Sequence, residues 1–185
     1  MSRTEIRLTG FGGQGIILAG YILGKAAALY DGKYATFTQS YGPESRGGAC
    51  AAQVVLSDAP VQYPHLIDPS VVVIMSQEAY NKYAPSLHDG NLLLVDEDLV
   101  VLGLLPQGVK VYAIPATRIA EAEVGRKMVA NIVMLGFLTA VSGVVSEQSM
   151  RRAVSESVPK GTEELNLKAF QAGLDYGRRL MGSAA

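Results

Sequence analysis

Groups on which metal and redox sites depend are nearly missing from this sequence. The 185 residues contain one cysteine, Cys50, which excludes an internal disulfide and any four-thiolate iron–sulfur cluster held by one copy of the chain. There are two histidines, and neither a His-Glu-x-x-His nor a Cys-x-x-Cys motif occurs. His65 lies in a proline-flanked loop and His88 near a predicted helix end, which favours surface or capping roles over metal ligation.

Long apolar runs and an excess of one charge are missing too. The longest apolar candidate is bounded by Lys25 and Asp31, so no segment reaches the roughly 18 residues of a membrane span. The net charge is −1, so no broad basic surface for nucleic acid or an anionic membrane is expected. The first residues lead into a strand without the apolar segment of a signal peptide. We therefore expect a soluble, cytoplasmic protein that binds neither nucleic acid nor membrane.

Side chains for covalent catalysis are equally scarce. No Gly-x-Ser-x-Gly elbow occurs, and Cys50 opens an apolar stretch, where it is expected to be a small buried hydrophobe rather than a nucleophile. The acidic residues Asp96, Glu97 and Asp98 follow a predicted strand, and a solvated loop is favoured over a cation site. We expect no catalytic residue and no metal ligand in this chain.

Glycine, by contrast, is abundant, and the stretch Gly-Phe-Gly-Gly-Gln-Gly at residues 10–15 is the feature around which the chain is organised. The alternating residues 5–9 predict a strand, and the apolar, alanine-rich residues 16–30 predict a buried helix. Gly10, Gly12 and Gly15 match the G-x-G-x-x-G spacing of a strand–turn–helix phosphate site, in which helix-start N–H groups face an anion. A turn that only closes the strand–helix unit fits the same pattern.

A dinucleotide is the first ligand to test against this turn. Such a site usually carries an Asp or Glu at the end of the second strand, about 20 residues further on, to bind the ribose. Here the predicted strand at residues 34–39 ends without an acid, and Asp31 precedes it. Simple NAD binding is therefore disfavoured, and a free-standing dinucleotide-binding oxidoreductase is kept as an alternative.

Alternating strands and helices predict the fold class. Nine residues between the second strand and the third cannot hold a crossover helix, so the third strand is expected to be antiparallel. The result is an α/β fold: a single three-layer α/β/α domain over residues 1–185 with a mostly parallel, mixed sheet. Asn131 is interpreted as a core or interface amide bonded to a neighbouring carbonyl, and the last helix as amphipathic and lid-like. The remaining strands are predicted at residues 49–57, 71–75, 91–95 and 109–114, and the remaining helices at 78–87, from 115, at 128–141, 146–155 and 162–181.

A second glycine-rich loop, residues 42–48, follows the second strand. If the first two strands are parallel, both loops lie at the same carboxyl edge of the sheet, where open α/β sheets bind ligands. Arg46 would then supply a fixed positive charge for a phosphate. A pair between Arg46 and Glu44 that shapes the loop is an equally good interpretation of the residues.

Together the two loops resemble the gamma subunit of 2-oxoacid:ferredoxin oxidoreductases. The match consists of Gly-Phe-Gly-Gly-Gln-Gly-Ile at residues 10–16 and Ser-Tyr-Gly-Pro-Glu-Ser-Arg-Gly-Gly at residues 40–48. Residues 127–131, Lys-Met-Val-Ala-Asn, and the Leu-Gly at 135–136 are also similar, so the resemblance covers nearly the whole chain. The second motif is closer to the 2-oxoglutarate type than to the indolepyruvate type, which usually has a His-Gly and a Gln before Arg-Gly-Gly.

The resemblance implies a non-autonomous subunit of an oxidoreductase. In this family the alpha and beta subunits hold thiamine diphosphate with Mg²⁺, and iron–sulfur clusters in the beta and delta parts carry electrons to ferredoxin. The gamma subunit would bind no cofactor alone, would close the active site, and would help to bind coenzyme A while 2-oxoglutarate is converted to succinyl-coenzyme A. An indolepyruvate- or pyruvate-type gamma subunit is an alternative. The implied contacts to coenzyme A are Gly10, Gly12, Gly13, Gln14, Gly15, Ser45, Arg46, Gly47 and Gly48.

Overall fold

A six-stranded sheet forms the centre of the protein. The computed structural model describes residues 3–41 and 48–183. Its strand order is β2-β3-β1-β4-β5-β6. The strands are β1 (Arg3–Phe11), β2 (Tyr34–Ser40), β3 (Ala49–Ser57), β4 (Val71–Ile74), β5 (Leu92–Asp96) and β6 (Lys110–Ile114). The α-helices are α1 (Ile16–Lys25), α2 (Gln77–Tyr83), α3 (Ala116–Ile119), α4 (Ala130–Ser142), α5 (Glu147–Ser157) and α6 (Glu163–Ser183).

The sheet is mixed, as the short connection before β3 predicts. β3 pairs antiparallel with both β1 and β2, so β1 and β2 run in the same direction. β4, β5 and β6 continue the sheet parallel to β1. The expected shared carboxyl edge for the first two strands is therefore confirmed, because β1 ends at Phe11 and β2 ends at Ser40, on either side of the first residues of β3.

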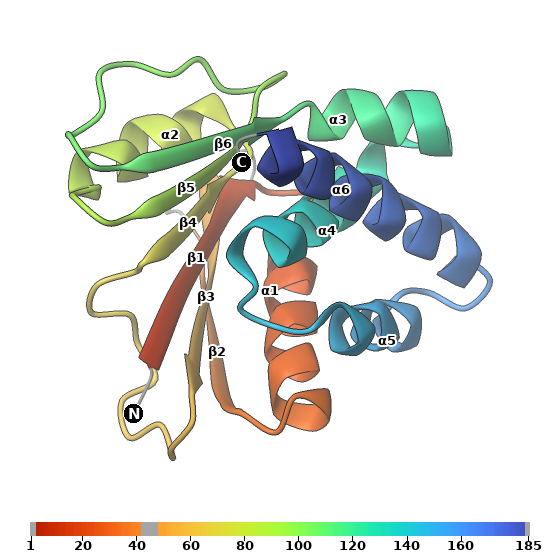
Figure 1. Ribbon diagram of the computed structural model, residues 1–185, viewed down its shortest axis with the longest axis horizontal. Helices are drawn as coiled ribbons and strands as arrows, with labels where there is room; N and C mark the ends of the chain where they lie inside the picture. The colour runs from red at the N-terminus through yellow and green to blue at the C-terminus, as the bar shows by residue number, and fades with distance from the viewer. Residues whose placement is uncertain (1–2, 42–47, 184–185) are drawn as a thin grey trace.

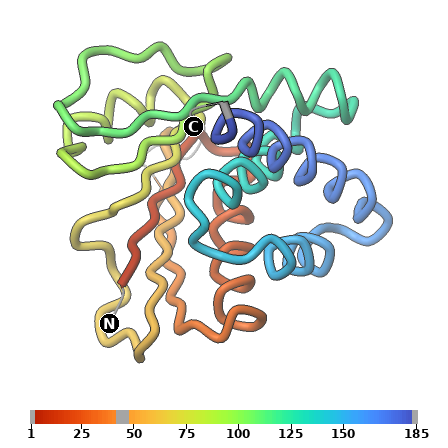
Figure 2. The backbone as a smooth tube through the Cα atoms, viewed as in Figure 1, coloured from red at the N-terminus to blue at the C-terminus, as the bar shows by residue number. Residues whose placement is uncertain are grey.

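Helices cover the two faces unequally. α2 packs on one face against β1 and β4, whereas α1 and α4 pack on the other, with α5 and α6 outside them (Figure 1). Figure 2 traces the same arrangement: β1 runs through the middle of the sheet, and the C-terminal third of the chain lies on the α1 side. The three-layer α/β/α architecture is thus confirmed, and the larger hydrophobic core lies on the side of α1 and α4.

Two predicted helices change their hydrogen-bonding pattern part of the way along. The helix expected at residues 16–30 is α-helical to Lys25 and π-helical at Ala26–Tyr30. The helix expected from Pro115 is α-helical only at Ala116–Ile119 and continues as a π-helix at Ala120–Val124. The side-chain period predicts where a helix lies but does not distinguish i−4 from i−5 bonding, because the choice depends on packing around the turn.

The last helix belongs to the core and is not a lid. α6 lies along α4, and its Ala169, Phe170 and Leu174 are buried. Glycines allow the close contact: a Cβ on Gly136 would lie 2.0 Å from the Phe170 carbonyl oxygen, and one on Gly173 would lie 1.8 Å from that of Val133. The lid-like interpretation was wrong. An amphipathic pattern is the same for a helix that covers a site and for one whose backbone packs directly against another helix.

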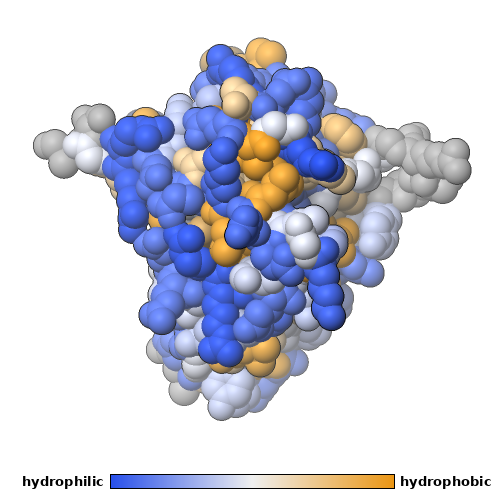
Figure 3. Space-filling view, turned by 90° about the vertical axis from the view of Figure 1, so that its right-hand side faces the viewer, coloured by the Kyte–Doolittle hydropathy of each residue, from blue (hydrophilic) through white to orange (hydrophobic). Residues whose placement is uncertain are grey.

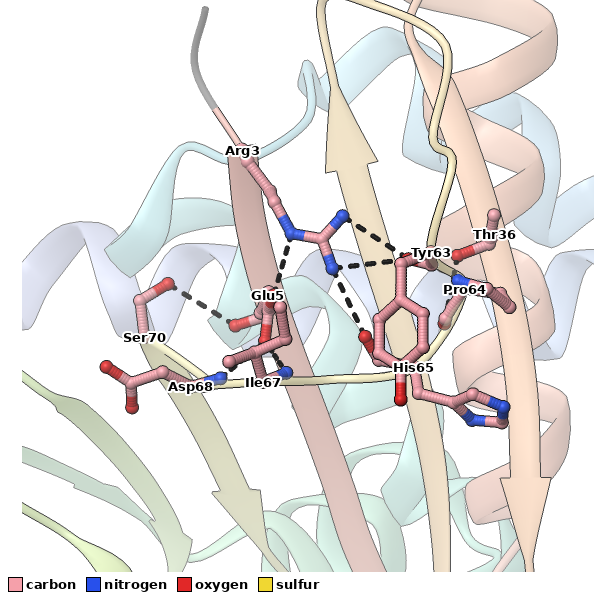
Figure 4. A network of polar contacts seen from close by, with 9 residues as sticks. All are labelled: Arg3, Glu5, Thr36, Tyr63, Pro64, His65, Ile67, Asp68 and Ser70. Atoms are coloured by element: carbon pink, nitrogen blue, oxygen red, sulfur yellow. Dashed lines mark hydrogen bonds and ion pairs between the residues drawn. The ribbon is translucent and has the colours of Figure 1, made fainter.

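A buried carboxylate fixes the long connection between β3 and β4. Glu5, only 5% exposed, accepts hydrogen bonds from the backbone N–H of Ile67 (2.6 Å) and of Asp68 (2.8 Å), and its other oxygen pairs with Arg3 Nε at 2.7 Å. Arg3 in turn donates to the carbonyl of His65 at 3.1 Å (Figure 4). This network lies at the amino-terminal end of the sheet.

Among residues 3–41 and 48–183, no helix combines the length and apolarity that a bilayer crossing requires.

Candidate ligand site at the glycine turn

The turn between β1 and α1 requires glycine at particular positions. Gly13 and Gly15 have φ values of 100° and 74°, the left-handed region that L side chains rarely adopt. A Cβ on Gly15 would also lie 2.4 Å from Asn131 Nδ2. Gly12 differs, because a Cβ there would meet no described atom within 4 Å. The protein's own described contacts therefore do not require Gly12, and that part of the turn is open for a ligand to approach the backbone.

Gln14 holds the turn in place. Its Oε1 accepts a hydrogen bond from the Phe11 N–H at 2.9 Å, and its Nε2 donates to the Met75 carbonyl at 2.7 Å. Met75 directly follows β4, so the side chain ties the turn to the neighbouring strand end. Both ends of the Gln14 amide are thus engaged inside the chain, a role that motif spacing does not reveal.

Asn131 supports the turn from α4. Its Nδ2 donates to the Gly15 carbonyl at 3.1 Å, and the residue is 4% exposed. The interpretation of Asn131 as a core amide bonded to a neighbouring carbonyl is confirmed. Gly15 is the N-cap of α1, and no side chain of residues 3–41 or 48–183 caps this helix. The start of α1, with its positive dipole end, is therefore not neutralised by an acidic side chain in its first turn.

A pocket of about 370 Å³ opens beside the turn. Its walls come from the start of α1, the segment before and into α4, the connection between α5 and α6, and the first turn of α6. Figure 3 shows that side of the molecule, where an apolar area is enclosed by hydrophilic residues. The lining residues are Gly13, Gly15, Leu18, Arg126, Met128, Val129, Asn131, Ile132, Val158, Pro159, Gly161, Thr162, Leu165 and Asn166.

The pocket combines apolar walls with one cation. Met128 is 72% exposed, so a large apolar side chain faces solvent at this place. Arg126 also lines the pocket, and in the part of the chain that the structure describes its guanidinium has no hydrogen-bond or ion-pair partner. Sequence reasoning did not select Arg126. Arg126 directly precedes residues 127–131, which belong to the resemblance. Because Arg126 is far from the glycine turn in the sequence, the sequence does not indicate that the two lie close together in space.

The second glycine loop can be placed only by its ends. Ser45, Arg46 and Gly47 lie outside the described residues, as does Glu44, so the choice between a phosphate contact and a Glu44 pair stays open. Gly48 is half-buried and directly precedes Ala49, the partner of Phe11 in the sheet. Tyr41 follows β2 at the same edge. Both ends of the loop therefore lie at the edge that carries the glycine turn.

The last residue of β5, Asp96, helps to cap a helix. Asp96 is fully buried and accepts hydrogen bonds from the Asp98 N–H (3.1 Å), the Thr117 N–H (3.1 Å) and Thr117 Oγ1 (2.6 Å). Burial raises the pKa of Asp96, and these hydrogen bonds partly oppose the rise. The expectation of a solvated loop was wrong for Asp96, because the carboxylate is used inside the fold to hold the start of α3.

Cys50, His88 and His65, the other side chains considered for chemistry, are buried in the core or lie at the surface. Burial raises the pKa of the Cys50 thiol, which is 5% exposed, in agreement with its expected role as a small hydrophobe. His88 is exposed and pairs with Asp68 at 2.6 Å, and His65 is exposed in its loop. Within residues 3–41 and 48–183, no cluster of His, Cys, Asp and Glu has the arrangement of a metal site.

Comparison with known proteins extends these observations to the whole chain. The family model for pyruvate ferredoxin/flavodoxin oxidoreductase matches residues 5–176. The 2-oxoglutarate synthase subunit KorC of Methanocaldococcus jannaschii is 56% identical over 179 residues, which are 96% of each chain. The keto/oxoacid ferredoxin oxidoreductase gamma subunit of Geobacter sulfurreducens has the same fold, with a TM-score of 0.83, 45% identity and coverage of 94% of this chain and 98% of that one.

A third comparison involves a longer chain. The 2-oxoglutarate:ferredoxin oxidoreductase of Magnetococcus marinus, solved with 2-oxoglutarate, coenzyme A and succinyl-CoA bound, aligns with a TM-score of 0.86 at 24% identity. That alignment covers 97% of this chain and 32% of the other, and at this identity it shows the fold alone. With the family match over residues 5–176 and a relative at 56% identity, this chain belongs to the pyruvate ferredoxin/flavodoxin oxidoreductase family.

Proposed function

We propose that the chain is the gamma subunit of a 2-oxoglutarate:ferredoxin oxidoreductase and that it helps to bind coenzyme A. The assembled enzyme would convert 2-oxoglutarate and coenzyme A to succinyl-coenzyme A and carbon dioxide while reducing ferredoxin. The KorC relative, which matches over 96% of its length, supports the 2-oxoglutarate type. The Magnetococcus marinus enzyme, which binds coenzyme A, supports the ligand.

The observation that carries the proposal is Arg126, which lies in an apolar pocket beside the glycine turn and has no ion-pair partner among the described residues. Coenzyme A combines phosphate groups with a long, largely uncharged pantetheine arm and an adenine ring. Phosphates suit the start of α1 and the Arg126 guanidinium, whereas the uncharged parts suit the walls formed by Leu18, Met128 and Val129. Gly12, with open space above it, lets the ligand reach the turn backbone.

The second glycine loop belongs to the same proposal. Tyr41 and Gly48, which flank residues 42–47 in the sequence, lie at the edge of the sheet that holds the turn, and this supports the proposal. Ser45, Arg46, Gly47 and Gly48 would then contact the coenzyme from the side of β2, opposite Arg126. Gly10, Gly13, Gln14 and Gly15 would shape the turn that meets the ligand between them.

The chemistry of decarboxylation would lie on partner subunits. Thiamine diphosphate with Mg²⁺ supplies the carbanion chemistry when bound, and iron–sulfur clusters supply electron transfer; the proposal assigns them to alpha, beta and delta subunits. The present chain, a single gamma domain over residues 1–185, would position coenzyme A and close the site against water. The complex would act in the cytoplasm.

Steady-state kinetics of the assembled complex tests the proposal. Arg126→Ala and Arg46→Ala should each raise the KM for coenzyme A roughly tenfold to a hundredfold, since a charge-assisted hydrogen bond contributes about 1.5–3 kcal/mol. The KM for 2-oxoglutarate should change little. Arg→Lys at either position should retain only part of the affinity for coenzyme A, because lysine keeps the charge but lacks the planar guanidinium.

Controls separate this effect from a general loss of charge. Lys110→Ala removes a cation at the start of β6, the amino-terminal edge of the sheet, and should leave the coenzyme A constant unchanged. If Glu44→Ala reproduces the Arg46→Ala defect, Arg46 shapes its loop instead of contacting phosphate. An unchanged KM for coenzyme A in both arginine variants would refute the proposed site.

A further inference from the structure

β2 is an edge strand without the usual protection. It lies at the end of the sheet and pairs only with β3, so its other edge carries backbone N–H and C=O groups without a strand partner among the described residues. Edge strands usually carry lysines, prolines or bulges that discourage pairing with another chain. Residues 34–41, Tyr-Ala-Thr-Phe-Thr-Gln-Ser-Tyr, contain no charge and no proline. The opposite edge strand, β6, begins with Lys110.

An apolar groove runs beside this open edge. It lies between α1 and β2, has a volume of about 300 Å³, and includes Tyr21, Leu29 and Phe37. Tyr21 and Phe37, which both line the groove, meet edge to face with ring centroids 6.3 Å apart. Leu29 is 66% exposed and Tyr21 and Tyr34 are each 50% exposed. Figure 1 shows β2 and α1 together at this end of the molecule.

We propose that β2 pairs antiparallel with β2 of a second copy of this chain, joining the two sheets across a two-fold axis at Phe37. This register pairs all seven residues of the strand: Tyr34 with Ser40, Ala35 with Gln39, and Thr36 with Thr38. The strand is self-complementary in this arrangement, because no like charges meet and each Thr36 faces a Thr38 of the other copy. The two hydroxyls keep their bonds within the chain, to the Pro64 carbonyl and to Gln53 Oε1, so the threonine methyl groups face each other across the axis.

The same axis brings the two grooves together. Phe37 and Ala35 pack toward the core on the α1 side, so both copies present their α1 helices on the same face of the joined sheet. Leu29 and Tyr21 of the two copies then cover one another where each is now exposed to water. A two-fold contact of this kind buries the same patch on both copies, which closes the assembly at two.

A charge-swap pair tests the contact and its register. The purified full chain should sediment at equilibrium as a species of twice the 19.6 kDa chain mass. Thr36→Lys combined with Thr38→Lys places lysines directly opposite each other twice, and should raise the dimer dissociation constant roughly tenfold or more. Thr36→Glu combined with Thr38→Lys places opposite charges in the same pairs and should keep the dimer.

Thermal unfolding of each variant shows whether the two double variants fold. If they do not, a single substitution tests the same contact. Gln39→Lys changes an exposed residue of β2 and should weaken the dimer, whereas Gln107→Lys makes the same change in the exposed loop before β6 and should not. A monomeric wild-type chain overturns the proposal and leaves β2 to a strand of another subunit. Equal dissociation constants for the two charge combinations also overturn it.

Discussion

At the scale of single residues, the glycines of the turn divide into two kinds. Gly13 and Gly15 are required by their backbone angles, and Gly15 also by the nearby Asn131 amide. Gly12 has no positive φ, and a Cβ added there would have no described neighbour within 4 Å. Substitution of Gly15 therefore reports on folding, whereas substitution of Gly12 reports on what approaches the turn from outside.

Gly15→Val should destabilise the chain and Gly12→Val should not. The left-handed conformation costs a branched residue about 1–2 kcal/mol, and the clash with Asn131 adds to this. Thermal unfolding should show a drop in Tm of roughly 4 °C or more for Gly15→Val. Gly12→Val should keep the Tm but raise the KM for coenzyme A in the assembled complex. Equal Tm values for the two variants would show that the turn geometry is not what requires Gly15.

At the scale of secondary-structure elements, the contact between α4 and α6 holds the C-terminal part of the fold. Gly136 and Gly173 let the two helices approach until a Cβ would overlap backbone atoms of the neighbour. Backbone atoms cannot move aside as a flexible side chain can. Because α4 also carries Asn131, the position of α4 against α6 determines how the glycine turn is supported.

Gly173→Ala should therefore destabilise the protein even though alanine is the better helix former. A Cβ at this position would lie 1.8 Å from the Val133 carbonyl oxygen, and forced repacking of this kind costs about 1–3 kcal/mol. Gly182→Ala, in the same helix where a Cβ would meet no described neighbour within 4 Å, should be neutral or stabilise by up to about 1 kcal/mol. Chemical denaturation of both variants measures the difference. A stabilised Gly173→Ala would disprove the close contact.

The start of α5 depends on a carboxylate from the other end of the chain. Asp31 accepts hydrogen bonds from the Ser146 N–H (2.6 Å), Ser146 Oγ (2.7 Å) and Ser149 Oγ. Burial by itself would raise the pKa of Asp31, but the hydrogen bonds from Ser149 and Ser146 outweigh it and lower the pKa. The stability that the ionised Asp31 contributes is therefore complete above the unfolded-state pKa of Asp, about 3.9. It is lost as the pH falls through the lower pKa of Asp31 in the folded state.

Asp31→Asn should lower the free energy of unfolding by about 0.5–1.5 kcal/mol at neutral pH. The difference from the wild type should shrink as the pH falls below about 4, because the wild-type carboxylate is then protonated. Urea unfolding at several pH values measures this convergence. Glu123→Gln, at an exposed position without a hydrogen bond among the described residues, should show no such pH-dependent difference. A difference for Asp31→Asn that is constant with pH would contradict the capping role.

At the scale of the whole molecule, the chain has the properties of a subunit. The pocket at the glycine turn provides binding groups, and the described residues form no metal cluster. A longer solved chain has the same fold, and this fold covers 32% of that chain. Under the proposed function, the reaction groups come from partner subunits that complete the site.

The isolated chain should fold without oxidising 2-oxoglutarate, whatever electron acceptor is supplied. Adding the partner subunits should restore turnover, and the restored rate should saturate with the amount of this chain added. Acceptor-reduction assays with and without partners measure this. Turnover by the chain alone would refute its role as a non-autonomous subunit, and tight NADH binding would support the dinucleotide alternative.

Elements with local causes can be predicted from the amino-acid sequence. The glycines at residues 10–15 predict the strand–turn–helix unit, since tight turns need backbone angles that glycine adopts freely. The nine residues before β3 predict its antiparallel direction because they are too few for a crossover helix. Asn131 was correctly placed as a buried amide, since a lone polar group in an apolar helix must find a partner.

Only the tertiary structure decided which residues meet across long stretches of sequence. It brought Arg126 to the glycine turn, engaged the Gln14 amide with Met75, and buried Asp96 beneath α3. Each of these depends on how helices and strands pack, which no local pattern specifies. The close contact of α4 with α6 has the same origin: a glycine within a helix is a local weakness until another backbone lies against it.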